Sequence, residues 1–270
     1  MPELPEVEVT RRALAAELTG ARIADVIIRT PKLRLPLSPE LSCLLPGRTL
    51  RKVVRRGKYL LLSCDNGCLV IHLGMTGHLR VHPTATEPGK HDHLDIVFRG
   101  DRVLRFNDPR KFGTVFWTTD DPLSHPLLAD IGPEPLEGEF TCDYLFALSR
   151  SRSVTVKQLI MDSSVVAGVG NIYANESLFR SGIQPSRPAK TLSKTESGRL
   201  VATIREVLAE SIEQGSTIMD FRVSEEPLRY HPLDFRVYGR GGKPCFECGG
   251  MLEEIRLGNR STVYCPDCQC

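Results

Sequence analysis

The spacing of hydrophobic residues changes along the chain. Residues 5–19 place Val7, Leu14 and Leu18 on one helical face, and Gly20 follows where a helix would end. The segments that come next are short and rich in Val, Ile, Leu and Phe, which is typical of strands. They are ADVIIRT (24–30), KYLLLSC (58–64), CLVIHLG (68–74), LDIVFR (94–99), RVLRFND (102–108) and TVFWTT (114–119).

Turn signals separate several of these segments. Asn66-Gly67 lies between two of them, and a tight hairpin turn needs positive φ at both central positions, which these residue types tolerate. Gly100-Asp101 is placed similarly between two later segments. So many short strands joined by tight turns predict an antiparallel β-sandwich.

Beyond residue 140 the hydrophobic period becomes helical. Leu200, Ile204, Leu208 and Ile212 recur every four residues, which predicts a long helix. The predicted helices are 143–150, 155–162, 171–182 and 195–215. Before them, residues 132–140 (GPEPLEGEF) hold two prolines, two glycines and three glutamates, and we expect a linker there.

The connector VVAGVGN (165–171) is too rich in glycine for a helix. Gly168 and Gly170 allow positive φ, and backbone N–H groups beside a helix start suit a phosphate group. A plain turn is the alternative.

Four of the nine cysteines form two CxxC pairs sixteen residues apart, in a segment with strand-like and turn-like stretches. Cys245, Cys248, Cys265 and Cys268 have the spacing of a four-thiolate zinc ribbon. Such a closed site is structural, so the expected single zinc ion holds a hairpin together and does not activate water. We expect the remaining cysteines to be reduced and without a role; they are Cys43, Cys64, Cys68, Cys142 and Cys270.

Length and charge narrow the class of protein. A chain of 270 residues suffices for two domains, and no run approaches the roughly 18 apolar residues of a membrane helix. The acidic N-terminus lacks the pattern of a secretion signal, so we expect a cytoplasmic location. The net charge is only +2, but residues 48–58 and 149–157 are basic and contain no acid. These stretches are either solvated faces or parts of a groove that binds phosphates.

The first residues, MPELPEVEV, fit the start of a helix, but they also suggest chemistry. Removal of Met1 would make Pro2 a secondary α-amine, and α-amines titrate near about 7.7–8.0, so part is unprotonated at neutral pH. Such an amine is a nucleophile toward a carbonyl-like carbon, and the iminium that it forms favours elimination of a neighbouring phosphate. Glu3 beside it would protonate a sugar ring oxygen. The pair would therefore open a deoxyribose.

Motifs along nearly the whole chain resemble one family. PELPEVE, RRGKYLLL, HLGMTGHLR, KHDHLD, DPRKFG, GPEPL, GVGNIYANESLFRSGI, VYGR and the CxxC pairs occur in the order of the formamidopyrimidine-DNA glycosylases. These are bacterial base-excision enzymes for oxidised purines. The resemblance implies that Pro2 attacks C1′ of the damaged nucleoside, that Glu3 is its acid–base partner, and that Lys58 lies near the damaged nucleotide and its flanking phosphate.

The same resemblance implies DNA contacts. Met75, Arg110 and Phe112 match the residues that fill the space left by an extruded base, and Arg110 also faces the orphaned cytosine. The positions that match DNA ligands are His91, Arg110, Lys157, Asn171, Tyr238 and Arg260. Glu6 and Glu176 match positions at the lesion pocket, although a helix-dipole role is an alternative for Glu6.

The expected fold is α+β with two domains. The implied limits are 1–131 for a catalytic β-sandwich with a leading helix, 132–140 for the linker, 141–235 for a helix-two-turn-helix domain with a lesion-capping loop, and 236–270 for a zinc-ribbon hairpin. The loop sequence departs from the family, because residues 224–240 lack the glycines expected between Ser224 and Tyr230. This departure leaves the preference between 8-oxoguanine and ring-opened purines open.

The implied function is excision of oxidised purines from double-stranded DNA through a Schiff base on Pro2, followed by β,δ-elimination, by a monomeric protein. One alternative is the endonuclease VIII branch, which prefers oxidised pyrimidines; PELPEVE and the set of Met75, Arg110 and Phe112 favour the purine branch. Another is a non-catalytic protein that binds damaged DNA, which Pro2, Glu3 and Lys58 argue against.

Overall fold

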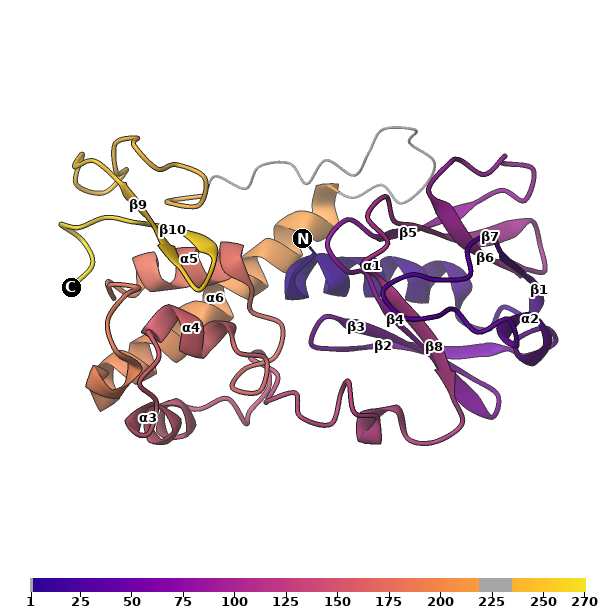
Figure 1. Ribbon diagram of the computed structural model, residues 1–270, viewed down its shortest axis with the longest axis horizontal. Helices are drawn as coiled ribbons and strands as arrows, with labels where there is room; N and C mark the ends of the chain where they lie inside the picture. Colours follow the sequence, from indigo (N-terminus) through magenta and orange to yellow (C-terminus); the bar gives the residue numbers. More distant parts are fainter. Residues whose placement is uncertain (1, 219–234) are drawn as a thin grey trace. The chain divides into compact units, whose positions relative to one another are not determined.

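The computed structural model describes residues 2–218 and 235–270 (Figure 1). The chain forms two compact units, the first made chiefly of residues 1–129 and the second of 130–214 with the C-terminal segment. Within the described ranges, no helix is long and apolar enough to cross a bilayer. The predicted domain limits remain predictions.

The first unit opens with helix α1 (Leu4–Leu18), which confirms the predicted helix to within one residue at each end. Pro5 lies in its first turn, where a missing N–H loses no hydrogen bond. The helix buries Leu14 and Leu18, and it packs on strands β2 (Leu50–Arg56), β3 (Tyr59–Cys64) and β5 (His78–His82).

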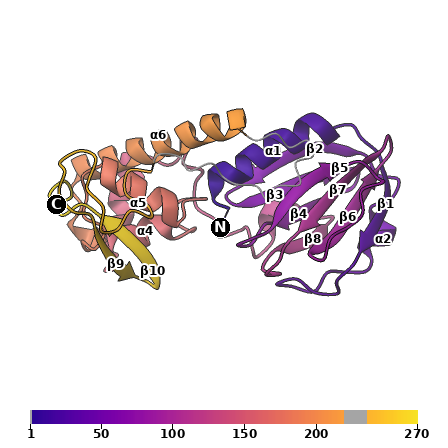
Figure 2. The same ribbon diagram turned by 90° about the horizontal axis from the view of Figure 1, so that it is seen from above.

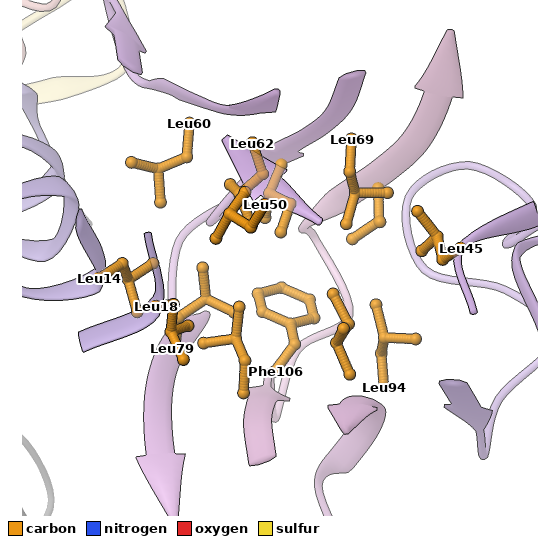
Figure 3. Packing of buried hydrophobic residues seen from close by; sticks show 14 of the residues in the cluster. Leu14, Leu18, Leu45, Leu50, Leu60, Leu62, Leu69, Leu79, Leu94 and Phe106 are labelled. Atoms are coloured by element: carbon orange, nitrogen blue, oxygen red, sulfur yellow. The ribbon is translucent and has the colours of Figure 1, made fainter. Parts of the chain in front are cut away.

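Two four-stranded antiparallel sheets form the sandwich (Figure 2). One has the order β1-β6-β7-β5 and the other β2-β3-β4-β8. The remaining bounds are β1 Ile23–Ile28, β4 Gly67–His72, β6 Asp92–Phe98, β7 Arg102–Asn107 and β8 Thr114–Thr118, with short helices α2 Leu41–Leu44 and η1 Pro122–Ser124. Leucine side chains and Phe106 fill the core between the sheets (Figure 3). The predicted β-sandwich is therefore confirmed.

The sequence prediction missed β2 and β5. Strand β2 coincides with the basic run, whose charged residues hide the alternation of buried Leu50 and Val53. Two of its arginines are paired within the protein: Arg51 Nε lies 2.7 Å from Asp65 and Arg55 Nε lies 3.2 Å from Glu8. The run is thus partly structural, and only the rest of its charge is available to a ligand.

The β3–β4 hairpin turns one residue earlier than predicted. Cys64 pairs with Gly67, so the turn consists of Asp65 and Asn66, and only Asn66 has a left-handed φ, of 60°. Gly67 is needed for another reason: a Cβ there would lie 2.2 Å from the Trp117 ring. Packing between strands, and not turn chemistry alone, selects this glycine.

The second unit is helical and ends in a hairpin. Its helices are α3 Cys142–Arg150, α4 Val156–Met161, α5 Asn171–Arg180, η2 Ala189–Thr191 and α6 Lys194–Ile218, and the hairpin strands are β9 Glu253–Leu257 and β10 Arg260–Tyr264. All four predicted helices are confirmed, and the connector before α5 is irregular as expected. Gly168 has φ of +80°, whereas Gly170 has φ of −126° and precedes α5 as its N-cap.

Residues 132–140 contain no helix or strand, but they are firmly bound to the helical unit. The guanidinium of Arg205 on α6 donates to the carbonyls of Pro135, Glu137 and Phe140 at 2.8–2.9 Å. Gly132 packs so closely on residues 164–165 that a Cβ would lie 2.6 Å from the Ser164 carbonyl oxygen. The segment is a fixed connection in this unit and not a loose tether.

Candidate functional site

Pro2 and Glu3 lie directly before α1, and both are buried. Glu3 is the N-cap residue of the helix and has an extended backbone. Its N–H donates to Glu6 Oε2 at 2.7 Å, which fixes the chain where it enters the helix. Glu6 thus supports the backbone of Glu3, a capping role that the expected lesion contact does not include.

Lys58 lies in the turn between β2 and β3, beside the half-buried His72 of β4. Burial lowers the pKa of His72 to about 4, and the cations Lys58 and Arg34 contribute to the shift. His72 is therefore neutral near pH 7. Its Nδ1 accepts the Gly74 N–H at 3.0 Å, and its ring contacts Tyr59 at 4.7 Å between centroids. The neutral imidazole connects the surroundings of Lys58 with the loop that carries Met75.

The three residues expected to fill the base void come from two loops of this unit, 73–77 and 108–113. The Arg110 guanidinium lies 4.6 Å from the centroid of the Phe112 ring, and Phe112 is 42% exposed although it is a large apolar residue. Met75 is half-buried. The loops touch through their backbones, because a Cβ on Gly74 would lie 2.5 Å from the Phe112 carbonyl carbon.

His91 lies at the start of β6 and is half-buried. Its carbonyl accepts the Asp108 N–H at 3.0 Å. The structure therefore places His91 next to the start of the 108–113 loop.

Lys157 contradicts the expectation of a DNA contact. Its side chain is 1% exposed, and its ammonium donates to Thr262 Oγ1 at 2.7 Å and the Ser261 carbonyl at 2.9 Å. Asn175 Oδ1 lies 3.4 Å away and also accepts the Val263 N–H at 3.0 Å. Lys157 holds α4 to the hairpin, and burial prevents it from reaching a phosphate.

The other expected phosphate ligands occupy accessible positions in the second unit. Arg260 is exposed and follows the Gly258-Asn259 turn, in which both φ values are positive, 52° and 61°. Two such residues form the tight turn that a two-residue hairpin requires. Asn171 begins α5, and its buried Oδ1 has no hydrogen-bond partner among the described residues.

Glu176 on α5 binds the chain that leads into the zinc hairpin. Its carboxylate accepts the N–H groups of Arg236, Val237 and Tyr238 at 2.8, 3.0 and 2.8 Å. It also lines a cavity of about 570 Å³ together with Tyr173. The carboxylate fixes the backbone of Tyr238, an expected DNA ligand. The glycine-poor stretch 224–234 lies outside the described residues.

The four predicted cysteine ligands converge. Their sulfur atoms all lie within 4.8 Å of one another, with Cys248 and Cys265 at 3.5 Å and Cys245 and Cys268 at 4.0 Å. A tetrahedral zinc site with bonds of about 2.3 Å needs sulfur atoms about 3.8 Å apart, so the thiols fit this ion. Four thiolates leave no position for water or substrate, and the zinc is structural.

Asp108 and His72 were not among the predicted site residues. Asp108 begins the DPRKFG motif and His72 begins HLGMTG, so the motifs themselves contained the signal. Their roles become visible only when the backbone groups that they bind are known.

The architecture defines a class of protein: a β-sandwich whose first helix follows Pro2 and Glu3, and a helical unit that ends in a zinc hairpin, form a base-excision DNA glycosylase. Three family models match in this order: formamidopyrimidine-DNA glycosylase N-terminal domain (1–115), formamidopyrimidine-DNA glycosylase H2TH domain (131–223) and zinc finger found in FPG and IleRS (242–269). The chain belongs to the formamidopyrimidine-DNA glycosylase family.

Relatives of full length agree with this assignment. The chain is 65% identical over 269 residues to the formamidopyrimidine-DNA glycosylase of Geobacter metallireducens and 62% identical to that of Pelobacter propionicus, with 100% of each chain covered. Among solved structures, a complex of Lactococcus lactis Fpg with DNA containing an abasic site matches with a TM-score of 0.90 at 32% identity, over 99% of each chain. The same enzyme bound to DNA containing N7-benzyl-Fapy-dG matches equally well, with a TM-score of 0.90.

Proposed function

We propose that the protein excises oxidised purines from duplex DNA and then cleaves the strand at the resulting abasic site. The observation that carries the proposal is the placement of Pro2 and Glu3 side by side before α1, with the Glu3 backbone fixed by Glu6. A positioned amine and a neighbouring acid supply a nucleophile and a proton donor.

The proposed reaction requires that Met1 be removed, because only then does Pro2 carry a nucleophilic lone pair. The Pro2 nitrogen bonds to C1′ while the bond from C1′ to the damaged base breaks. Glu3 protonates the sugar ring oxygen, so that the ring opens to a cationic iminium. Loss of a proton from C2′ then expels the 3′ phosphate, a second elimination expels the 5′ phosphate, and water releases the sugar fragment from Pro2.

Two groups of residues would hold the DNA. Met75, Arg110 and Phe112 would occupy the space of the extruded base, and the exposure of Arg110 and Phe112 on one loop supports this role. Asn171, Arg260, Tyr238 and His91 would bind the backbone, and Lys58 would lie at the damaged nucleotide. The DNA in related structures supports a damaged-duplex substrate, since Lactococcus lactis Fpg was solved with Fapy-dG DNA.

A second lesion class is favoured by a specific observation. Lactococcus lactis Fpg was also solved with DNA containing an oxidised pyrimidine, so a lesion panel should include thymine glycol beside 8-oxoguanine. We further propose that the protein acts as a monomer, and sedimentation of the free protein and of its DNA complex would detect a dimer.

The experiment is borohydride trapping on a duplex with 8-oxoguanine opposite cytosine, followed by mass spectrometry of the crosslinked peptide. We expect an adduct on Pro2 of protein that lacks Met1. Glu3→Gln should abolish base release while DNA binding persists, and Glu17→Gln, at the far end of the same helix, should behave like the unaltered protein. No adduct with any member of the lesion panel, from Met1-free protein that binds the duplex, would contradict the proposal.

A further inference from the structure

Asp108 is a fully buried carboxylate that lies where the two loops with the expected void-filling residues meet. Its Oδ1 accepts the Thr76 hydroxyl at 2.6 Å, and its Oδ2 accepts the Gly113 N–H at 2.7 Å. The Arg110 N–H lies 3.3 Å from both Asp108 Oδ1 and Thr76 Oγ1. One carboxylate thus contacts residues on each side of Phe112 and the residue that follows Met75.

The main chain of Asp108 is held as well. Its N–H donates to the His91 carbonyl, and its carbonyl lies 2.9 Å from His93 Nε2. Because Asp108 is anchored at both its backbone and its side chain, the Thr76 hydroxyl bond ties loop 73–77 to a fixed point.

This arrangement has a physical purpose. Side chains that replace a base in a stacked duplex work best when their backbone is already in the bound geometry, because ordering it during binding would cost conformational entropy. A buried carboxylate is tolerated only when donors surround it, and here the donors are the groups of the two loops. The carboxylate and the loops therefore stabilise each other.

We infer that Asp108 and Thr76 form a positioning pair that keeps Met75, Arg110 and Phe112 arranged to fill the base void. The inference rests on the proposed function and adds to it: the pair touches neither substrate nor the reacting atoms, and it acts through the loops. It should matter where a base must be extruded from a duplex and not where DNA is single-stranded.

The test uses Thr76→Val, which keeps the shape of the side chain and removes the hydroxyl donor, with Thr76→Ser to restore it. Asp108→Asn is the second variant. The matched control is Thr84→Val, because Thr84 donates to Asp101 in a similar bond on the same unit, away from loops 73–77 and 108–113.

Three readouts separate positioning from general damage to the fold. The first is single-turnover excision from a duplex with 8-oxoguanine opposite cytosine. The second is borohydride trapping on a single-stranded oligonucleotide with an abasic site. The third is fluorescence of 2-aminopurine next to the lesion, which reports local unstacking.

We expect Thr76→Val to slow duplex excision about tenfold, which corresponds to about 1.4 kcal/mol, and to reduce the 2-aminopurine signal. Single-stranded trapping should not change, and Thr76→Ser should recover the duplex rate. Asp108→Asn should show the same pattern, and Thr84→Val should show no defect. Equal rates for Thr76→Val and the unaltered protein on the duplex, or an equal loss on both substrates, would overturn the inference alone. Absence of trapping by the unaltered protein would overturn the proposed function first.

Discussion

Replacement of Lys157 by methionine tests whether this lysine is structural or binds DNA. Methionine fills a similar volume, so the change removes the two short hydrogen bonds to Thr262 and Ser261 without opening a large cavity. A hydrogen bond from a charged donor contributes about 1.5–3 kcal/mol, and relief of the buried charge offsets part of the loss. We therefore expect Lys157→Met to lower the free energy of unfolding by about 2–4 kcal/mol. For a domain of this size the melting temperature should fall by about 5–15 °C.

The DNA measurement is the salt dependence of binding. Each phosphate contact contributes about 0.9 to the slope of log K against log salt, so a lysine on a phosphate would reduce the slope by about one when removed. We expect the slope to be unchanged for Lys157→Met, because the side chain is 1% exposed. Arg260→Ala is the comparison: Arg260 is exposed on the same hairpin, and its removal should reduce the slope by about one without lowering the melting temperature. A lower slope with an unchanged melting temperature for Lys157→Met would refute the reasoning.

Three further predictions follow from the other sites. Chelation of zinc, or Cys248→Ser, should abolish DNA binding and leave less than one bound metal ion per chain by mass spectrometry; full binding by metal-free protein would show that the hairpin holds without the ion. The pKa of His72 is about 4 in the folded protein against 6.5 unfolded, so acidification from pH 6.5 to 4 protonates the unfolded chain first and destabilises the fold by up to about 3 kcal/mol. His72→Asn should lack this part of the loss in urea titrations at each pH, and identical profiles would be evidence against it. Glu176→Gln should speed hydrogen exchange at the 236–238 amides by about tenfold or more, whereas Ser177→Ala, the neighbouring buried position, should leave it unchanged.

The sequence was most informative where the signal is local. The four-residue spacing from Leu200 to Ile212 marks one face of a helix whatever the helix packs against, and α6 confirms it. The CxxC pairs need only two short segments and a common ligand, so their chemistry could be predicted before their geometry. Pro2 and Glu3 are adjacent in the chain, and the motif that contains them pointed to their chemistry.

Prediction failed where a partner is distant in the sequence. Lys157 and Thr262 are separated by 105 residues, and nothing near Lys157 indicates that its charge is buried. Thr76 and Asp108 are separated by 32 residues, and each belongs to a different motif. Strand β2 was hidden because its arginines neutralise acids on α1 and in the next hairpin turn.

The sequence alone therefore determined the helices, most of the strands, the metal and the class of enzyme, because periodicity, thiolate spacing and motifs are properties of short segments. Only the tertiary structure decided which charged side chains are available to DNA and which are consumed inside the fold. The physical reason is burial: a charge removed from water must find donors or acceptors, and folding, not proximity in the chain, brings those partners to it.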